Sequence, residues 1–420
     1  MSDIQLQPLK GFRQLYPEKK VIQSYVLNKA REVARLFGFE EYDGPLLEPI
    51  ELYLNKSSRE LVEEQSFKVN DKNNNTYLMR PEMTPTLARM VAAKYKELIL
   101  PIRYFNAGLR YRYEAPQKGR DREFYQMDFD IIGSKSEISD IEILAIVATL
   151  FKSLGANKDN FVLYLNSRKI LAKKLAEIGI SSDQNKLVMS QVDRKEKISA
   201  DEFEKLLIET NITNDQVKGV NRLLNDTKGY REEFKSILDL AKQYEIDDLI
   251  EVNPTVVRGL DYYTGIVFEA KSKGKLNRSL MGGGRYDNLV ASYGATEAIG
   301  GVGFALSDSV ALAFMEEFGL LPQLNPVPSQ ALVTMLDASA TNIALKTAFR
   351  LRSSGINSEV YPDSSAKLDK QLRYADKKQI PIVVIIGPDE VKNNTITVKY
   401  MNERKQETLS VEELIQKLKK

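Results

Sequence analysis

Cysteine, histidine and tryptophan are all absent from this sequence of 420 residues. Without cysteine, the chain can form no disulfide, use no thiolate nucleophile and hold no cysteine-bound zinc or iron–sulfur cluster. Without histidine, no imidazole can act as a general base, a nucleophile or a metal ligand. Any chemistry must therefore rest on arginine, lysine, carboxylates, amides, tyrosine or a group that the substrate brings.

The sequence also lacks a long apolar run and a strong charge imbalance. No apolar stretch approaches the roughly 20 residues of a membrane-spanning helix, and residues 1–10 lack the pattern of a secretory signal. We therefore expect a cytoplasmic protein with no membrane partner. With 60 basic against 58 acidic residues, the net charge is only +2, so any contact with nucleic acid must be local.

Hydrophobic periodicity predicts an α+β protein. Helical patterns over residues 21–37 and 139–154 enclose three strand-like runs, at 77–80, 102–113 and 123–132. Loops rich in Asn, Gly and Pro separate these strands. The mixture is typical of an antiparallel sheet with helices rather than of a doubly wound parallel sheet.

The later part of the chain changes character twice. Residues 167–246 are rich in Lys and Glu and helical in period, which indicates a helical insertion, and strand character returns over 252–271 and 279–289. Prolines from Pro322 onwards mark a linker before alternating strands and helices that carry a mild excess of basic residues. We therefore predict a first α+β segment, an insertion, a second α+β segment and a C-terminal α/β domain, at residues 1–166, 167–246, 247–322 and 326–420.

The densest charged cluster lies in residues 108–130, where two alternating strands are joined by a long turn. Alternation places three polar residues on one face of the second strand: Gln126, Asp128 and Asp130. On the first strand, one face carries Arg110, Arg112 and Glu114. Converging guanidinium groups bind polyphosphates, because their planar forks neutralise and orient phosphate oxygens. A solvated hairpin with surface ion pairs explains the same spacing equally well.

Residues 80–89 place an acid and a hydroxyl two positions apart, at Glu82 and Thr84. Such a pair can receive an ammonium group. In isolation the simpler interpretation is that Thr84 is the N-cap of a helix that runs to Tyr95.

Two further segments combine arginine with glycine. Residues 258–265 lead from Arg258 into an aromatic pair, Tyr262 and Tyr263, which as ordinary strand residues would face opposite sides. Residues 282–289 join three glycines to an arginine. Glycines there permit close approach of the backbone to a ligand, although a glycine run also marks a turn or a bulge.

Together these segments resemble the histidyl-tRNA synthetase family. The resemblance runs from Gly11-Phe-Arg13 to Gly387, and its most specific part is Arg258-Gly-Leu-Asp-Tyr-Tyr-Thr-Gly265 with Gly282-Gly-Gly-Arg-Tyr-Asp287. It implies a class II fold: an antiparallel sheet of six or seven strands flanked by helices, with a helical insertion and a C-terminal α/β anticodon-binding domain. It also implies a homodimer that activates L-histidine with ATP, which brings Mg²⁺ as part of the substrate, and loads tRNA(His). No tightly bound cofactor is implied.

The resemblance assigns roles to individual residues. For histidine it implies contacts with Glu82, Met83, Thr84, Arg112, Gln126, Asp130, Arg258, Tyr262 and Tyr263. For ATP it implies Arg112, Glu114, Arg120, Arg122 and Arg285. Asp130 and Tyr263 fall where the family reads the imidazole, and an acid left unpaired by an analogue enforces specificity. The implied catalytic residues are Arg112, Gln126 and Arg258, of which Arg258 lies against the α-phosphate in place of a metal ion.

The sequence departs from the family at its third motif. Ser309 and Val310 stand where the family has Glu-Arg, and that arginine normally grips the γ-phosphate. Its loss leaves Arg285 or Arg120 as the candidate replacement.

An inactive relative is the alternative: the regulatory subunit of ATP phosphoribosyltransferase, which binds histidine as a signal. Such subunits lack the anticodon domain and tend to lose the substrate residues. This chain keeps Glu82, Arg112, Gln126 and Arg258 together with residues 326–420. We therefore expect an active ligase.

Overall fold

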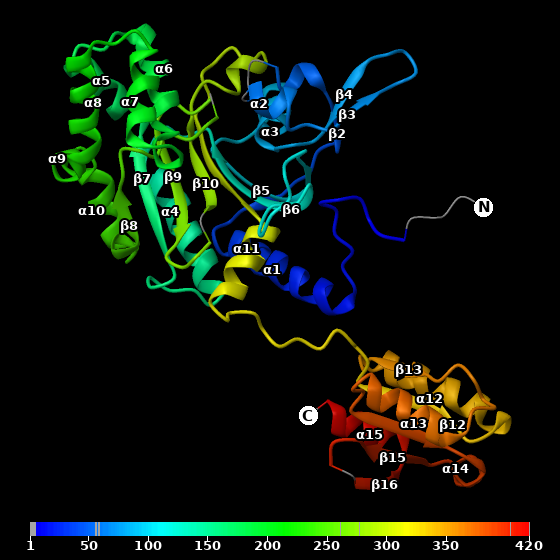
Figure 1. Cartoon of the computed structure of the whole chain (residues 1–420). Helices are drawn as coiled ribbons and strands as arrows, with labels where there is room; N and C mark the ends of the chain where they lie inside the picture. Colours follow the sequence, from blue (N-terminus) through cyan, green and yellow to red (C-terminus); the bar gives the residue numbers. More distant parts are fainter. Residues whose placement is uncertain are drawn as a thin grey trace. The chain divides into compact units, whose positions relative to one another are not determined.

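The computed structural model describes residues 6–54, 57, 59–260, 262–276, 278–403 and 405–419. The chain forms two compact units, which meet in the sequence at Pro322 and Gln323 (Figure 1). Within the described ranges, no helix is long and apolar enough to cross a membrane.

An eight-stranded sheet is the centre of the larger unit, in the order β1-β5-β6-β11-β10-β9-β7-β8. Its strands are β1 (Glu40–Glu41), β5 (Ile102–Tyr111), β6 (Glu123–Ile132), β7 (Phe161–Ser167), β8 (Ile250–Val252), β9 (Ile266–Ser272), β10 (Ser279–Tyr286) and β11 (Gly301–Ser307). Each central pair is antiparallel, whereas the edge strands β1 and β8 run parallel to their neighbours.

The predicted α+β class with a class II antiparallel sheet is confirmed. The expected six or seven strands become eight because two short edge strands, of 2 and 3 residues, extend the sheet. Runs this short carry no readable alternation, so sequence periodicity cannot find them.

Helices cover one face of the sheet and bury an apolar core against it. They are α1 (Pro17–Leu36), α4 (Glu137–Ser153) and α11 (Asp308–Glu317). Met127 and Phe129 of β6 point into this core, and Phe129 stacks on Phe304 of β11 with ring centroids 4.9 Å apart. The helix predicted over residues 21–37 is confirmed. Helix α1 begins at Pro17 and ends two residues before Gly38, so a proline start and a glycine stop mark it in the sequence.

A small three-stranded sheet lies in the same unit, in the order β2-β4-β3. Its elements and their helices are β2 (Leu47–Pro49), β3 (Lys68–Asn70), β4 (Thr76–Met79), α2 (Arg59–Glu63) and α3 (Thr84–Lys94). Helix α3 starts at Thr84 itself, with Met83 in the N-cap position and Pro85 in its first turn. The interpretation of Thr84 as an N-cap is therefore wrong. Thr84 is instead the first helical residue, and within the described part of the chain no side chain caps this end of the helix.

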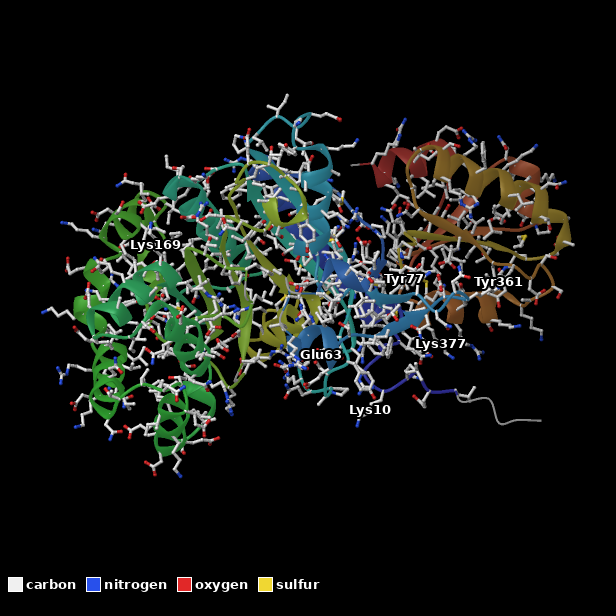
Figure 2. All side chains as sticks on the ribbon, turned by 90° about the horizontal axis from the view of Figure 1, so that it is seen from above. Lys10, Glu63, Tyr77, Lys169, Tyr361 and Lys377 are labelled. Carbon is white, nitrogen blue, oxygen red and sulfur yellow. The ribbon has the colours of Figure 1, made fainter. Side chains whose placement is uncertain are left out.

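Six helices follow β7 and precede β8: α5 (Arg168–Glu177), α6 (Ser182–Val192), α7 (Ala200–Ile208), α8 (Asn214–Asn225), α9 (Thr227–Glu232) and α10 (Lys235–Gln243). Helices α5 to α8 bury a separate apolar cluster that includes Leu171, Val188, Phe203 and Val220. Figure 2 shows charged side chains covering the outside of these helices, with Lys169 among them. The helical periodicity of residues 167–246 therefore reflects a small hydrophobic core that is separate from the core of the large sheet.

The smaller unit has a five-stranded sheet, in the order β13-β12-β14-β15-β16, with helices on both faces. Its elements are β12 (Ala331–Met335), α12 (Thr341–Ser353), β13 (Ser358–Val360), α13 (Leu368–Lys377), β14 (Ile382–Ile386), α14 (Pro388–Asn393), β15 (Ile396–Tyr400), β16 (Lys405–Leu409) and α15 (Val411–Leu418). Both faces of β14 are apolar because both are covered, which explains its uninterrupted run of Ile and Val.

Candidate active site

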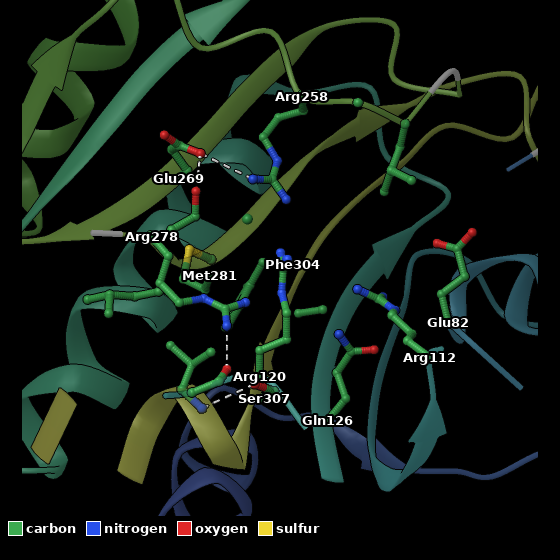
Figure 3. A pocket seen from close by; sticks show the side chains of 18 of the residues that line it. Glu82, Arg112, Arg120, Gln126, Arg258, Glu269, Arg278, Met281, Phe304 and Ser307 are labelled. Carbon is green, nitrogen blue, oxygen red and sulfur yellow. Dashed lines mark hydrogen bonds and ion pairs between the residues drawn. The ribbon is translucent and has the colours of Figure 1, made fainter. Parts of the chain in front are cut away.

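The large sheet borders a cavity of about 1060 Å³ in the larger unit. In Figure 3, Arg258 and Arg278 lie on one side of this cavity, and Arg112, Gln126 and Glu82 lie on the other. Most of the residues that the sequence predicts for the site line it: Glu82, Thr84, Arg112, Glu114, Arg120, Gln126, Asp130, Arg258, Tyr262 and Tyr263.

Three polar side chains of β6 form the floor of the cavity: Gln126, Asp128 and Asp130. Their chain neighbours Met127 and Phe129 point into the core on the opposite face of the sheet. The sequence predicts this division from the alternation of polar and apolar residues, and the structure confirms it. The amide oxygen of Gln126 is buried without a hydrogen-bond partner among the described residues, so it can accept one from a ligand.

Arg110 is the buried counterion of this floor. Its guanidinium donates to Asp128 at 2.7 Å and to the amide oxygen of Asn106 at 2.6 Å, and both side chains of the ion pair are buried. An ion pair out of water needs such additional hydrogen bonds, because burial strips both charges of their hydration. The interpretation of this hairpin as a solvated surface is therefore wrong for its central residues.

Asp130 is buried at the end of the floor and accepts a hydrogen bond from the Tyr286 hydroxyl at 2.5 Å. Burial raises the pKa of Asp130 to about 8, although the bond from Tyr286 opposes part of this shift. Gly303 of β11 lies against the carboxyl so closely that a Cβ atom there would overlap it. The raised pKa favours the protonated carboxyl at neutral pH, which suits a ligand that can share a proton.

Glu82 forms the opposite end together with two tyrosines. It accepts hydrogen bonds from the Ser57 hydroxyl and, at 3.2 Å, from the Tyr262 hydroxyl. Burial raises the pKa of Glu82, while Ser57, Arg112 and Tyr262 each oppose that shift. Tyr262 packs edge-to-face on Tyr263 with ring centroids 4.9 Å apart, and both rings line the cavity. They are not ordinary strand residues facing opposite sides.

The loop of residues 253–265 carries these tyrosines, where the sequence predicts a continuous strand over 252–271. Asn166 donates to two of its carbonyl oxygens at 3.0 and 2.8 Å, and Arg168 donates to three others at 3.1, 3.3 and 2.5 Å. The strand prediction is confirmed over residues 266–271 by β9 but is wrong over 253–265, where side chains rather than a neighbouring strand satisfy the backbone. Asp261 lies outside the described residues.

Arg258 reaches into the cavity from the same loop. Its backbone has φ +64°, in the left-handed region that costs a side-chain-bearing residue about 1–2 kcal/mol. Its guanidinium crosses Gly282 of β10, where a Cβ atom would overlap it, and donates to Glu269 at 3.1 Å. Its Nε has no hydrogen-bond partner within the described part of the chain. The loop therefore holds a fixed guanidinium with a donor available for an anion.

Arg112 faces Arg258 across the cavity (Figure 3). Its Nε donates to the carbonyl of Pro81 at 2.9 Å, which fixes the guanidinium beside Glu82. Two arginines that are far apart in the sequence thus line one cavity. Their charges make this part of the cavity suitable for a phosphate.

Three of the predicted residues lie apart from the cavity. Met83 is fully buried at the start of α3. The Arg122 guanidinium stacks on the ring of Tyr113, 3.9 Å from its centroid, and the Arg285 guanidinium pairs with Asp140 at 2.5 Å. Met83, Arg122 and Arg285 are therefore not among the residues that line this cavity, because their side chains make internal contacts.

The residues at the third motif form a structural network at the edge of the cavity. Asp308 is buried and accepts from Arg13 at 2.8 Å and from Gln23 at 2.5 Å. Ser309 donates to Asp121 at 2.6 Å. An ion pair therefore joins Arg13, near the N-terminus, to Asp308 in the first turn of α11.

Sequence reasoning missed several residues of the cavity, including Glu269, Arg278 and Tyr286. Glu269 and Tyr286 lie in strands that the sequence predicts. The pairing of β9 with β10 brings Glu269 beside Arg258, and the pairing of β10 and β6 with β11 brings Tyr286 beside Asp130. In the sequence, only the position of Arg278 shortly before the glycines at 282–284 could have indicated that it belongs to the site.

Comparisons with known proteins identify the family of this chain. The family model for histidyl-tRNA synthetase matches residues 11–309, and a model for an anticodon-binding domain matches residues 330–420. A histidine–tRNA ligase of Leptospira biflexa is 38% identical, over 98% of this chain and 96% of that protein. Crystal structures of histidyl-tRNA synthetases from Nostoc and S. aureus align with TM-scores of 0.81 and 0.74, at 23% and 25% identity. Each alignment covers 99% of this chain, with 99% of the Nostoc chain and 100% of the S. aureus chain. The chain therefore belongs to the histidyl-tRNA synthetase family.

Proposed function

We propose that this chain is a ligase that activates L-histidine with ATP and transfers it to tRNA(His). The observation that carries this proposal is one cavity that is lined by Arg112 and Arg258 and also by Glu82, Asp130 and Tyr263. An amino acid needs a carboxylate for its ammonium group, ATP needs cations for its phosphates, and an imidazole needs a partner that shares its proton. The cavity supplies all three.

Activation follows from the placement of these groups. Glu82 receives the ammonium group of histidine, and Asp130 with Tyr263 receives the imidazole. Gln126 accepts a hydrogen bond from the ammonium group as well. Arg112 orients the carboxylate, one oxygen of which attacks the α-phosphorus while pyrophosphate leaves in line. Arg258 neutralises the charge that develops on the α-phosphate oxygens. Because positioning and charge neutralisation lower the barrier, a chain without histidine can perform this reaction.

Transfer completes the proposed reaction. A hydroxyl of the terminal tRNA ribose attacks the carbonyl carbon of the histidyl-adenylate, and AMP leaves with the bonding electron pair. We assign tRNA binding to the anticodon-binding domain, residues 326–420, and the catalytic fold to residues 1–166 and 247–322, with 167–246 as the insertion. The enzyme would act in the cytoplasm, where these substrates meet.

Mg²⁺ enters this proposal with ATP, as part of the substrate. Within the described residues, no group of three or more acidic side chains is arranged to hold a metal ion, and histidine and cysteine are absent from the chain. Glu114 lines the cavity beside Arg120, with which it pairs at 2.6 Å. We assign both residues to the nucleotide.

The proposed enzyme is a homodimer. Apolar side chains around the small sheet remain exposed in the single chain, namely Leu46, Leu47, Leu54 and Val69. A second copy would cover them, and exposed apolar groups that gather on one sheet are typical of an interface. Sedimentation equilibrium tests this assignment directly.

ATP–pyrophosphate exchange, measured with each common amino acid in turn, tests the proposed function. We expect exchange with histidine and background rates with all the others. Exchange with none of the amino acids, in a folded protein that binds histidine, would favour the inactive regulatory relative.

The role of Asp130 predicts how histidine binding depends on pH. We expect the bound imidazole to keep its own N–H and to share one further proton with the Asp130 carboxyl, so Asp130 must be protonated when histidine binds, and above pH 8 binding requires the uptake of one proton. The ratio of wild-type to Asp130→Asn affinity should then fall about tenfold per pH unit in that range. Titration calorimetry from pH 6 to about pH 10 measures this ratio, in which the titration of free histidine cancels. A ratio that stays constant would remove Asp130 from the imidazole site.

A further inference from the structure

The terminal phosphates of ATP need a cation that α11 cannot provide. The family resemblance places the γ-phosphate arginine at Val310, and α11 contains no lysine or arginine. Ser309 is engaged with Asp121 at 2.6 Å. Of the two replacements that the sequence offered, Arg285 is buried against Asp140, and Arg120 pairs with Glu114 at 2.6 Å. Another side chain must therefore neutralise the phosphates beyond the α-position.

Arg278 lines the cavity from the turn between β9 and β10 (Figure 3). One terminal nitrogen of its guanidinium donates to the carbonyl of Gly119 at 2.5 Å. Gly119 belongs to the long turn between β5 and β6, which also carries Arg120. The bond therefore holds the Arg278 guanidinium against the segment that we assign to the nucleotide.

The remaining donors of Arg278 are available. Its Nε is buried and has no hydrogen-bond partner among the described residues, and within the same residues its guanidinium makes no ion pair. Burial lowers the pKa of Arg278, and the nearby charges of Arg120 and Arg112 lower it further, although Glu114 opposes this effect. These guanidinium groups repel one another in a partly buried place, and a bound polyanion would offset that repulsion.

The other cations at this end are already engaged or exposed. Arg120 pairs with Glu114 at 2.6 Å, and Lys271 pairs with Glu269 at 3.3 Å. Lys275 is an exposed side chain at the tip of the same turn. Arg278 combines partial burial, a fixed position and a donor without a partner in the described structure.

We propose that Arg278 binds the terminal phosphates of ATP and takes the place of the arginine that this chain lacks at Val310. This inference rests on the proposed function, since it assumes that ATP occupies the cavity with its α-phosphate between Arg112 and Arg258. Arg278 is thus a substrate-binding residue supplied by a different part of the fold.

Two variants of Arg278 test the proposal by nucleotide affinity. In Arg278→Ala, the affinity for ATP should fall about ten- to a hundredfold, because a charge-assisted contact is lost. The affinity for AMP should change less than twofold, since AMP has no terminal phosphates. Arg278→Gln keeps the aliphatic stem and a polar end without the charge and should show the same selective loss, which guards against misfolding of the alanine variant.

Lys273→Ala is the matched control, because Lys273 lies in the same turn and its ammonium donates to the carbonyl of Lys158 instead. This control should leave both affinities at the wild-type values. Unchanged ATP affinity in both Arg278 variants would overturn the proposal, and so would equal losses for ATP and AMP in the folded glutamine variant. Failure of the wild type to exchange pyrophosphate with histidine would overturn the proposed function instead, so the two failures are distinguishable.

Discussion

Replacing Arg258 with alanine should lower the rate of ATP–pyrophosphate exchange by about a thousandfold or more, while histidine still binds. Groups that neutralise a transferring phosphoryl centre contribute rate factors of this size, because they act on charge that develops in the transition state. The ammonium and imidazole contacts do not depend on this side chain. Steady-state exchange and calorimetric histidine binding measure the two effects separately.

The fold should survive this substitution. The loop around residue 258 is held by Asn166 and Arg168 through backbone carbonyls, which the alanine variant retains. Arg258→Lys is the informative companion, because it keeps the charge but loses the planar fork and should also be strongly impaired. Exchange at the wild-type rate in the alanine variant would remove Arg258 from the mechanism.

The second large effect concerns stability. Arg110→Ala should lower the free energy of unfolding of the larger unit by about 3–5 kcal/mol, because Asp128 would remain buried without its counterion. Asn106 would lose a partner as well. Urea unfolding followed by tyrosine fluorescence measures this loss, since the chain contains no tryptophan.

The double variant Arg110→Met with Asp128→Leu separates the charge from the packing. Removing both charges should restore much of the lost stability, because no unpaired ion remains in the floor. If the double variant loses as much unfolding free energy as the two single variants lose together, the ion pair contributes little coupling energy.

Local periodicity in the sequence was sufficient for the main elements. The alternation in residues 123–132 predicted both the strand and the division between its polar floor and its apolar face. Helix α1 could be predicted from a proline start and a glycine stop. These features depend on residues that are near one another in the chain, so the sequence contains all the information that they need.

Periodicity did not distinguish the arginines. Arg110 and Arg112 share one face by alternation, yet Arg110 is neutralised by Asp128 of the neighbouring strand, whereas Arg112 faces the cavity. The strand ends at Tyr111, between them. Which partner a guanidinium meets depends on strand pairing, and strand pairing joins residues that are distant in the chain.

The sequence by itself determined the α+β class, the order of the elements and the motifs that place the chain among histidyl-tRNA synthetases. Only the tertiary structure decided that Arg258 and Arg112 share one cavity, that Arg285 is buried with Asp140, and that Arg278 is present at the site. The physical reason is that a long charged side chain can reach several partners. Burial and the packing of distant segments select one of them, and no local pattern records that choice.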